Sequence, residues 1–181
     1  MTNEQDNVLR ILDANINRSE EAMRTIEEYI RFVLNDRFLT ETVKQMRHDL
    51  QALAEQLPWV ERVLARDSSK DVGRTVAIDS EYERHDISHV VAAALGRLKQ
   101  SLRALEEYSK VLAAELGEGF ERLRYQTYDL EKVFVSQEVA NDLFESLTIY
   151  GLVPGGERQA DFETYVISLL KAGIDVIQLR D

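Results

Sequence analysis

The chain has 181 residues, of which 44% are hydrophobic and 30% charged, and it contains two prolines and no cysteine. A domain of roughly 150 residues can bury a core without disulfides or a structural metal. The lack of cysteine excludes thiolate metal sites, cysteine nucleophiles and disulfide frameworks. The formal net charge of -11 at pH 7 disfavours nucleic acid and anionic membranes as partners. An anionic small molecule could bind only where arginines gather locally.

The N-terminal sequence lacks the basic and apolar segments of a secretory signal, and no apolar run approaches the roughly 18 residues of a membrane span. We therefore expect a cytoplasmic protein with neither a membrane nor a nucleic acid as partner. The sequence leaves the oligomeric state open, a homo-oligomer included.

Periodic apolar residues predict helices through most of the first 146 residues. Residues 7–34 and 39–57 show the pattern, and Pro58 ends the second helix before a short one at 59–65. Residues 66–84 lose the periodicity, which predicts a long irregular connection with one short strand at 75–78. Helix is expected again over 86–116 and, after an interruption at 117–119, over 120–135 and 139–145. These elements predict an all-α domain over residues 1–146 with two long helices related by an internal repeat.

The repeat joins the first and fourth helical segments. Residues 14–31, ANINRSEEAMRTIEEYIR, align without gaps to residues 93–110, AALGRLKQSLRALEEYSK. The alignment pairs Arg24 with Arg103 and matches the Glu-Glu-Tyr triplets at 27–29 and 106–108. Because two copies are too few for a solenoid, we expect a pseudo-symmetric helix pair whose repeated stretches face one shared space.

One stripe of each repeat carries polar and charged side chains. In the first copy the stripe is spaced four, three, four and three, so its members lie on one helix face: Asn17, Glu21, Arg24, Glu28 and Arg31. The second copy has Gly96, Gln100, Arg103, Glu107 and Lys110 at the equivalent positions. Arginine suits two-pronged contact with phosphate or carboxylate. The alternative is a solvated face with surface ion pairs such as Glu27 with Arg31.

Residues 147–181 change pattern and predict a second, smaller unit. A β-rich run ends at Pro154, an amphipathic helix covers 161–171, and IDVIQLRD at 174–181 is typical of a buried parallel strand. One β-α-β unit cannot cover both faces of its own sheet. About 35 residues of this kind therefore need more chain or a partner.

The segments YGLVP at 150–154, KAG at 171–173 and VIQLRD at 176–181 resemble the opening of a thiamine-phosphate synthase barrel. The resemblance implies a β-α-β fragment of a TIM barrel in which Gln178 and Arg180 contact the pyrimidine diphosphate substrate. The other strands of an eight-stranded barrel are missing from this chain. We therefore expect it to have no thiamine-phosphate synthase activity.

A second resemblance rests on six segments, which occur in this order along the chain: 12–32, 47–49, 65–73, 81–84, 102–110 and 121–131. They are similar to the small helical kinase domain that is often fused ahead of that synthase in bacteria. The resemblance implies ATP-dependent phosphorylation of 4-amino-5-hydroxymethyl-2-methylpyrimidine phosphate to its diphosphate. The rival interpretation is a non-catalytic helical module that dimerises or regulates the synthase.

Transfer of a phosphoryl group to a phosphate acceptor needs cations and usually Mg²⁺ more than covalent chemistry. The chain has no Walker A motif and no protein-kinase motif. In the loop 66–74 we predict that Asp67 and Asp71 hold Mg²⁺ and that Arg66 and Gly73 contact phosphate. A plain polar turn is the alternative.

The stripe residues complete the predicted site. We expect Asn17, Arg18 and Arg97 to contact the phosphates of the substrate and ATP, and the catalytic residues to be Arg24, Arg31, Arg103, Lys110 and Glu28. Glu28 and Glu107 would orient the arginines or bind metal. The poor helix formers near Asn17 support a site there, and an N-terminal cap in a broken helix is the alternative.

Overall fold

The computed structural model describes residues 3–67, 71–72, 84–154 and 159–180. These residues form two compact units, whose boundary falls between Glu131 and Lys132. The predicted strand at 75–78 lies outside the described residues. None of the helices in the described part of the chain is long and apolar enough to cross a membrane.

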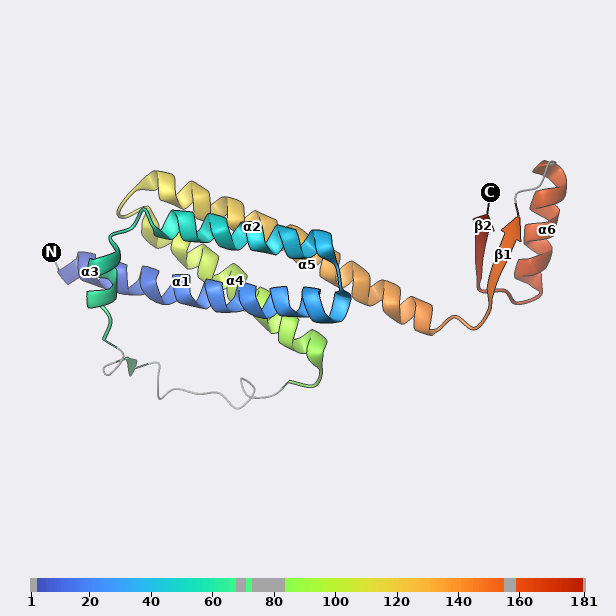
Figure 1. The fold of residues 1–181 in the computed structure, drawn as a ribbon, viewed down its shortest axis with the longest axis horizontal. Helices are drawn as coiled ribbons and strands as arrows, with labels where there is room; N and C mark the ends of the chain where they lie inside the picture. Colours follow the sequence, from blue (N-terminus) through green and yellow to red (C-terminus); the bar gives the residue numbers. More distant parts are fainter. Residues whose placement is uncertain (1–2, 68–70, 73–83, 155–158, 181) are drawn as a thin grey trace. The chain divides into compact units, whose positions relative to one another are not determined.

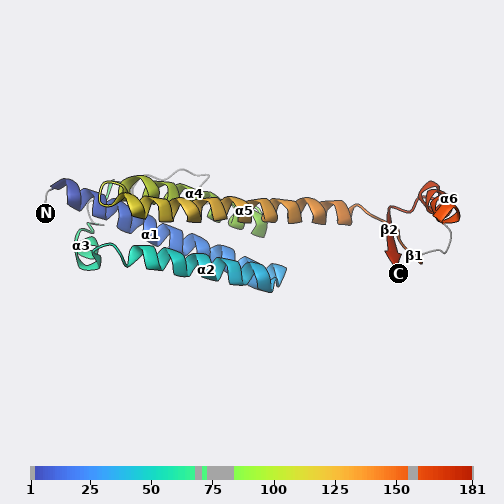
Figure 2. The same cartoon turned by 90° about the horizontal axis from the view of Figure 1, so that it is seen from above.

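The first unit is built from helices. They are α1 (Asn3–Tyr29), the π-helical turn η1 (Ile30–Leu34), α2 (Arg37–Ala54), α3 (Trp59–Leu64), α4 (Ile87–Ser109) and the first part of α5 (Ala114–Glu145). Helices α1, α2 and α4 and the first part of α5 pack side by side, and α1 runs antiparallel to both α2 and α4 (Figures 1 and 2). The predicted all-α class and the two long repeated helices are confirmed.

The connection from α1 to α2 is defined by local backbone chemistry. Asn35 adopts a left-handed conformation with φ of 52°, and its N–H donates to the carbonyl of Ile30. Asparagine tolerates this conformation better than most residues do. The side chain of Asp36 then accepts a hydrogen bond of 2.9 Å from the N–H of Leu39 and caps the N-terminus of α2.

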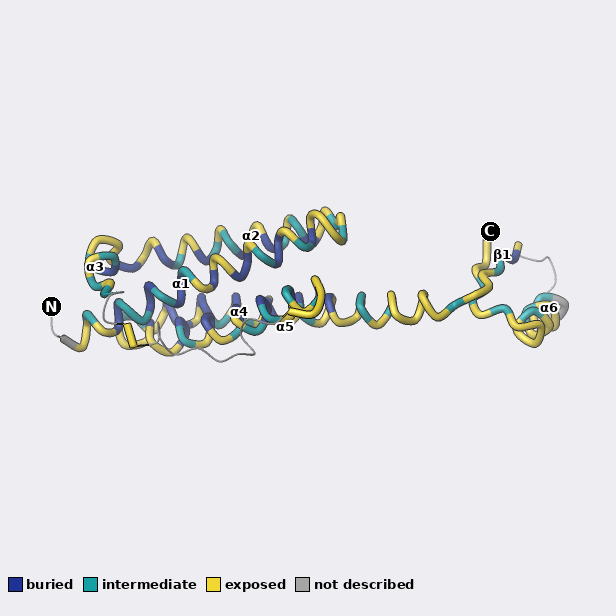
Figure 3. Tube along the Cα trace, turned by 90° about the horizontal axis from the view of Figure 1, so that it is seen from below, coloured by how far each residue is buried: buried dark blue, intermediate teal, exposed yellow. Residues whose placement is uncertain are grey.

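The core of the first unit consists of the apolar stripes of the four long helices. Buried positions recur along α1, α2, α4 and the first part of α5 (Figure 3). The largest fully buried side chains include Met23, Met46, Leu98, Leu102 and Phe120. Burial of such side chains is the main source of stability in a domain of this size.

Small residues let α1 and α4 approach closely near their middles. The hydroxyl of Ser19 donates to the hydroxyl of Ser101 at 2.8 Å, and both residues are buried. Ser101 in turn donates to backbone carbonyls of its own helix, which satisfies its hydroxyl. Ser19 and Ser101 therefore lie at the same level of the antiparallel pair formed by α1 and α4.

The predicted interruption at 117–119 is wrong. The chain leaves α4 after Ser109 and enters α5 at Ala114, so Gly117 and Gly119 lie inside a helix. The side chain of Leu53 from α2 occupies the space where Gly119 would carry a Cβ. These glycines therefore allow close packing rather than ending a helix.

The second unit contains the last part of α5 and a β-α-β element. Strand β1 (Tyr150–Pro154) pairs in parallel with β2 (Val176–Arg180), and α6 (Gln159–Lys171) lies between them in sequence. The carboxylate of Asp175 accepts hydrogen bonds from the N–H groups of Thr148 and Ile149, which lower the pKa of Asp175. The predicted β-α-β order and the parallel pairing are confirmed, but β2 is not buried as predicted, since its residues are intermediate or exposed. The predicted helices 120–135 and 139–145 are parts of α5.

Candidate functional site

A buried carboxylate organises the polar contacts between α1 and α2. Only 2% of the Glu27 side chain is exposed, and Nη1 of Arg47 lies 2.5 Å from its Oε2 atom. Arg24 and Arg31 lie one turn away on either side of Glu27, with N···O distances of 3.8 and 3.9 Å. Three guanidinium groups thus surround one buried carboxylate.

Beside this cluster the surface forms a hollow of about 990 Å³ between α1, α2 and α3. This volume is in the range of small-molecule sites. The side chains of Arg24, Arg47 and Arg62 reach it from three different helices. Its other lining residues are Glu20, Glu21, Thr25, Glu28, Gln51, Ala54, Glu55 and Trp59.

Arg62 links α3 to α1 and fixes one wall of the hollow. It is buried, and its Nε lies 3.3 Å from the carboxylate of Asp13. Its Nη1 donates to the carbonyl of Ala54 at 3.3 Å. Because Arg62 is charged and planar, these contacts hold α3 in a defined position against α1.

The start of the predicted loop site is anchored at the same carboxylate. Arg66 forms a bidentate contact with Asp13, with distances of 2.5 and 3.0 Å, and this hydrogen bonding raises the pKa of Arg66. Arg10 donates to the backbone carbonyl of Asp67 at 3.4 Å. Arg10, Arg66 and Asp67 line a second hollow of about 490 Å³ between the start of α1 and the end of α3.

The metal site predicted at Asp67 and Asp71 stays a prediction. Both residues are described, whereas Gly73 lies outside the described residues. Among the residues that the structure describes, no group of three or more histidine, aspartate or glutamate side chains is arranged to hold a metal ion. Two carboxylates still fit Mg²⁺, because this ion is usually bound by one or two carboxylates together with substrate phosphates.

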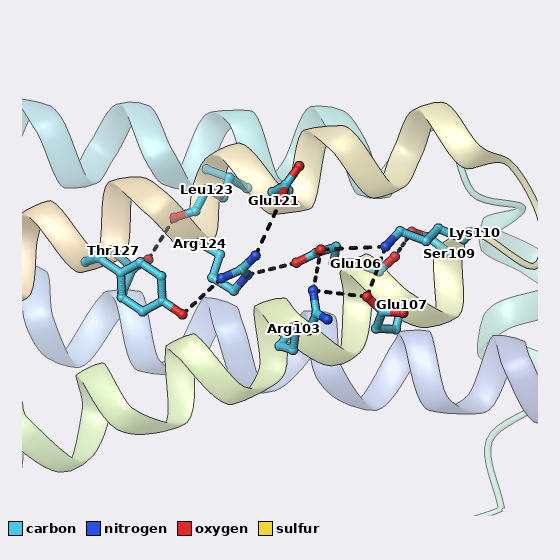
Figure 4. A network of polar contacts seen from close by, with 10 residues as sticks. Arg103, Glu106, Glu107, Ser109, Lys110, Glu121, Leu123, Arg124 and Thr127 are labelled. Carbon is cyan, nitrogen blue, oxygen red and sulfur yellow. Dashed lines mark hydrogen bonds and ion pairs between the residues drawn. The ribbon is translucent and has the colours of Figure 1, made fainter.

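A second buried carboxylate, Glu106, lies between α4 and α5 (Figure 4). Nε of Arg124 donates to it at 2.8 Å, and Nη1 of Arg103 donates to it at 2.5 Å. Arg124 also donates to the hydroxyl of Tyr128, and these hydrogen bonds raise the pKa of Arg124. Lys110 donates to Glu107 at 2.9 Å, which lowers the pKa of Glu107.

The two clusters are related by the sequence repeat but differ in charge balance. Glu27 corresponds to Glu106, and Arg24 corresponds to Arg103. Around Glu106 the cations Arg103, Lys110 and Arg124 are matched by the carboxylates of Glu106, Glu107 and Glu121. Around Glu27 the three arginines share a single buried carboxylate. The first cluster also borders the hollow, where Glu20, Glu21, Glu28 and Glu55 lie beside the arginines, so direct contact with the guanidinium groups rather than net charge distinguishes this site.

The structure does not bring the two predicted sets of residues into one shared space. Helices α1 and α4 are antiparallel and touch at Ser19 and Ser101 (Figure 1). Glu27 and Glu106 lie beyond this contact in opposite directions, roughly 20 Å apart at 1.5 Å per residue. Arg24 and Glu28 line the hollow and Arg31 shares Glu27, whereas Arg103 and Lys110 belong to the distant cluster.

The remaining predicted residues lie elsewhere. Asn17 donates to Asp13 at 3.4 Å, near the Arg62 and Arg66 contacts, while Arg18 and Arg97 are exposed on α1 and α4. Gln178 and Arg180 are exposed on β2 in the second unit, where the hydroxyl of Tyr150 donates to the side chain of Gln178.

Sequence reasoning missed Glu27, Arg47, Arg62, Glu106 and Arg124. A signal for Glu27 was present, because Ile16, Met23, Glu27 and Ile30 follow one helical face. A charge within an apolar stripe indicates a buried, paired group. Arg47 and Arg62 could not be assigned to Glu27 and Asp13 without knowing how the helices pack.

A sequence model of the ThiD2 family matches residues 10–133. The chain belongs to this family. The matched range contains Glu27, Glu106 and all three arginines that reach the hollow.

Curated relatives extend the similarity to the whole chain. It is 42% identical over 187 residues to a thiamine-phosphate synthase of Rhodopirellula baltica, in an alignment that covers 100% of this chain and 50% of the relative. The thiamine-phosphate synthases of Synechocystis sp. and Nostoc punctiforme are 36% and 34% identical, with 96% and 98% of this chain and 48% of each relative covered. The chain thus spans about half the length of these relatives. No solved structure matches it. The matches support a domain related to thiamine biosynthesis.

Proposed function

We propose that the chain phosphorylates 4-amino-5-hydroxymethyl-2-methylpyrimidine phosphate to its diphosphate, with ATP as donor, in the hollow between α1, α2 and α3. The observation that carries the proposal is the group of three arginines that share buried Glu27, two of which, Arg24 and Arg47, line the hollow. The family match and the names of the relatives support the same pathway.

The chemistry of this reaction suits such a site. An oxygen of the acceptor phosphate forms a bond to the γ-phosphorus of ATP, the bond from that phosphorus to the bridging oxygen breaks, and ADP leaves. The attacking oxygen is already anionic, so no general base is required. The protein must instead offset the charges of two phosphate-bearing ligands and align them. Arg24, Arg47 and Arg62 would bind and orient the acceptor phosphate, and Glu28 would limit how far Arg24 can move.

Asp67 and Asp71 are the residues we propose to hold Mg²⁺, and Arg66, fixed by Asp13, would contact phosphate from the second hollow, between the start of α1 and the end of α3. When bound, Mg²⁺ neutralises charge on the phosphate oxygens of ATP. Asp13 would keep both Arg62 and Arg66 in place, since it contacts each of them.

For the second unit we propose the opening of a thiamine-phosphate synthase barrel. The parallel pairing of β1 and β2 around α6 and the names of the relatives support this proposal. Gln178 and Arg180, near the end of β2, would then contact the pyrimidine diphosphate that the first unit makes.

The test is a kinase assay on the full chain with the pyrimidine monophosphate, ATP and Mg²⁺, in which the diphosphate is separated by anion-exchange chromatography. The unphosphorylated alcohol serves as the control acceptor. The proposal predicts diphosphate formation that depends on ATP and falls about tenfold or more in Arg47→Ala. Arg37→Ala is the matched control, because Arg37 is 91% exposed on α2 and pairs only with Glu41 among the described residues. Absence of diphosphate with the wild-type chain would refute the proposal.

A non-catalytic helical module is the second candidate. The exposed side chains of Phe32 (73%) and Phe38 (75%), at the connection between α1 and α2, favour it, because such residues often mark a binding surface. The same assay separates the two functions, since a binding module forms no diphosphate.

A further inference from the structure

Trp59 is the single tryptophan of the chain, and it lies on the wall of the hollow. It is the first residue of α3, directly after Pro58, whose ring fixes the backbone where the helix starts. Arg24 and Arg47 line the same hollow from α1 and α2. An aromatic residue and two arginines therefore line one open volume.

The indole ring is left uncovered by the protein itself. Trp59 is 64% exposed, and within the described residues its side chain has no ring partner, no cation–π contact and no hydrogen bond. Tryptophan is rarely left this exposed, because its ring is large and mostly apolar. Tyr125 and Tyr128 differ, since their rings contact each other and Arg124.

An uncovered indole near two arginines matches a ligand that has both an aromatic ring and a phosphate group. The ring favours stacking on a planar aromatic heterocycle. The arginines favour a phosphate group. The volume of about 990 Å³ accommodates both parts of such a molecule.

We propose that Trp59 stacks on the aromatic ring of the phosphorylated ligand in the hollow and thereby selects ring-bearing phosphates over phosphate alone. This inference rests on the proposed function for the choice of ligand. Both the pyrimidine monophosphate and ATP carry a heterocycle and phosphate, and the experiment distinguishes them.

The indole itself reports the contact, because it supplies all the tryptophan fluorescence of the chain. The full chain is titrated separately with the pyrimidine monophosphate, ATP and inorganic phosphate. We expect saturable quenching by at least one ring-bearing phosphate, and the more strongly bound of the two identifies the occupant. Inorganic phosphate should cause little quenching even where calorimetry detects its binding. No quenching by either ring-bearing phosphate, or equal quenching by inorganic phosphate, would overturn the inference.

Variants then separate stacking from a structural role of Trp59. Calorimetry with the ligand identified by quenching should show about tenfold weaker binding to Trp59→Leu and nearly normal binding to Trp59→Phe, because phenylalanine keeps an aromatic face. Phe38→Leu is the matched control, since Phe38 is also exposed but lies on α2 outside the hollow. Wild-type affinity in Trp59→Leu would contradict stacking. Diphosphate formation without quenching would refute the role of Trp59 alone, whereas quenching without diphosphate would refute the kinase proposal alone.

Discussion

Glu27 and Glu106 are carboxylates that the fold removes from water and surrounds with arginine. An isolated buried carboxylate costs several kcal/mol, so each must be paired. Arg47 from α2 pairs with Glu27, and Arg124 from α5 pairs with Glu106, at 2.5 and 2.8 Å. Each ion pair therefore joins two helices in addition to placing cations near the surface.

A double-mutant cycle on Glu27 and Arg47 tests this pairing. We expect Arg47→Met to lower the free energy of unfolding by about 2 to 3 kcal/mol, because it leaves Glu27 buried with only the two longer ion pairs. Adding Glu27→Gln should recover at least half of that loss. Urea denaturation gives the values, and Arg37→Met on the exposed face of α2 should change stability by less than about 0.5 kcal/mol. Strictly additive losses would show that the two residues do not interact.

For individual residues, the sequence predicted which side chains lie near the hollow better than it predicted their burial and their partners. Arg24 and Glu28 were expected in the site and do line the hollow. The alternative interpretation placed Glu27 at the surface, paired with Arg31; Arg31 does lie 3.9 Å from Glu27, yet only 2% of the Glu27 side chain is exposed. The helical spacing of Glu27 with Met23 and Ile30 favoured burial, but the partner that makes burial tolerable comes from α2.

The helices themselves were predictable because most of them combine an apolar stripe with a terminal signal. Pro58 separates α2 from α3, and Asp86 caps α4 through the N–H of His89. The glycines of α5 were misleading, since their role is close packing against Leu53 and Lys110, which depends on other helices. Local sequence therefore predicts where helices exist more reliably than where glycine ends them.

Asp36 gives a prediction at the scale of one element. Replacing Asp36 with alanine removes the hydrogen bond to the N–H of Leu39, and we expect a loss of about 1 kcal/mol in the free energy of unfolding. Asp36→Asn should retain most of the stability, because asparagine also caps helices. Thermal and urea denaturation measure both variants. Equal losses in the two variants would mean that the cap contributes nothing specific.

In the first unit, the sequence repeat predicted two similar groups of charged residues, but it did not predict that the groups around Glu27 and Glu106 lie far apart. A repeat leaves open how its copies cross, and the antiparallel contact at Ser19 and Ser101 puts the clusters at opposite ends of the helix pair. The hollow beside Glu27 also needs α3, which contributes Trp59 and Arg62 and precedes the second copy in the chain. The hollow lies beside Glu27, and this asymmetry between two related clusters is why we propose the site at the Glu27 end.

We propose that the arginines around Glu27, rather than the related cluster around Glu106, serve phosphoryl transfer. Arg24 and Arg103 occupy equivalent positions in the repeat, so Arg24→Lys and Arg103→Lys form a matched pair. We predict that kcat/KM for the pyrimidine monophosphate falls about tenfold or more in Arg24→Lys and stays within about threefold of wild type in Arg103→Lys, with similar melting temperatures. Equal losses in both variants, or a larger loss in Arg103→Lys, would contradict the account.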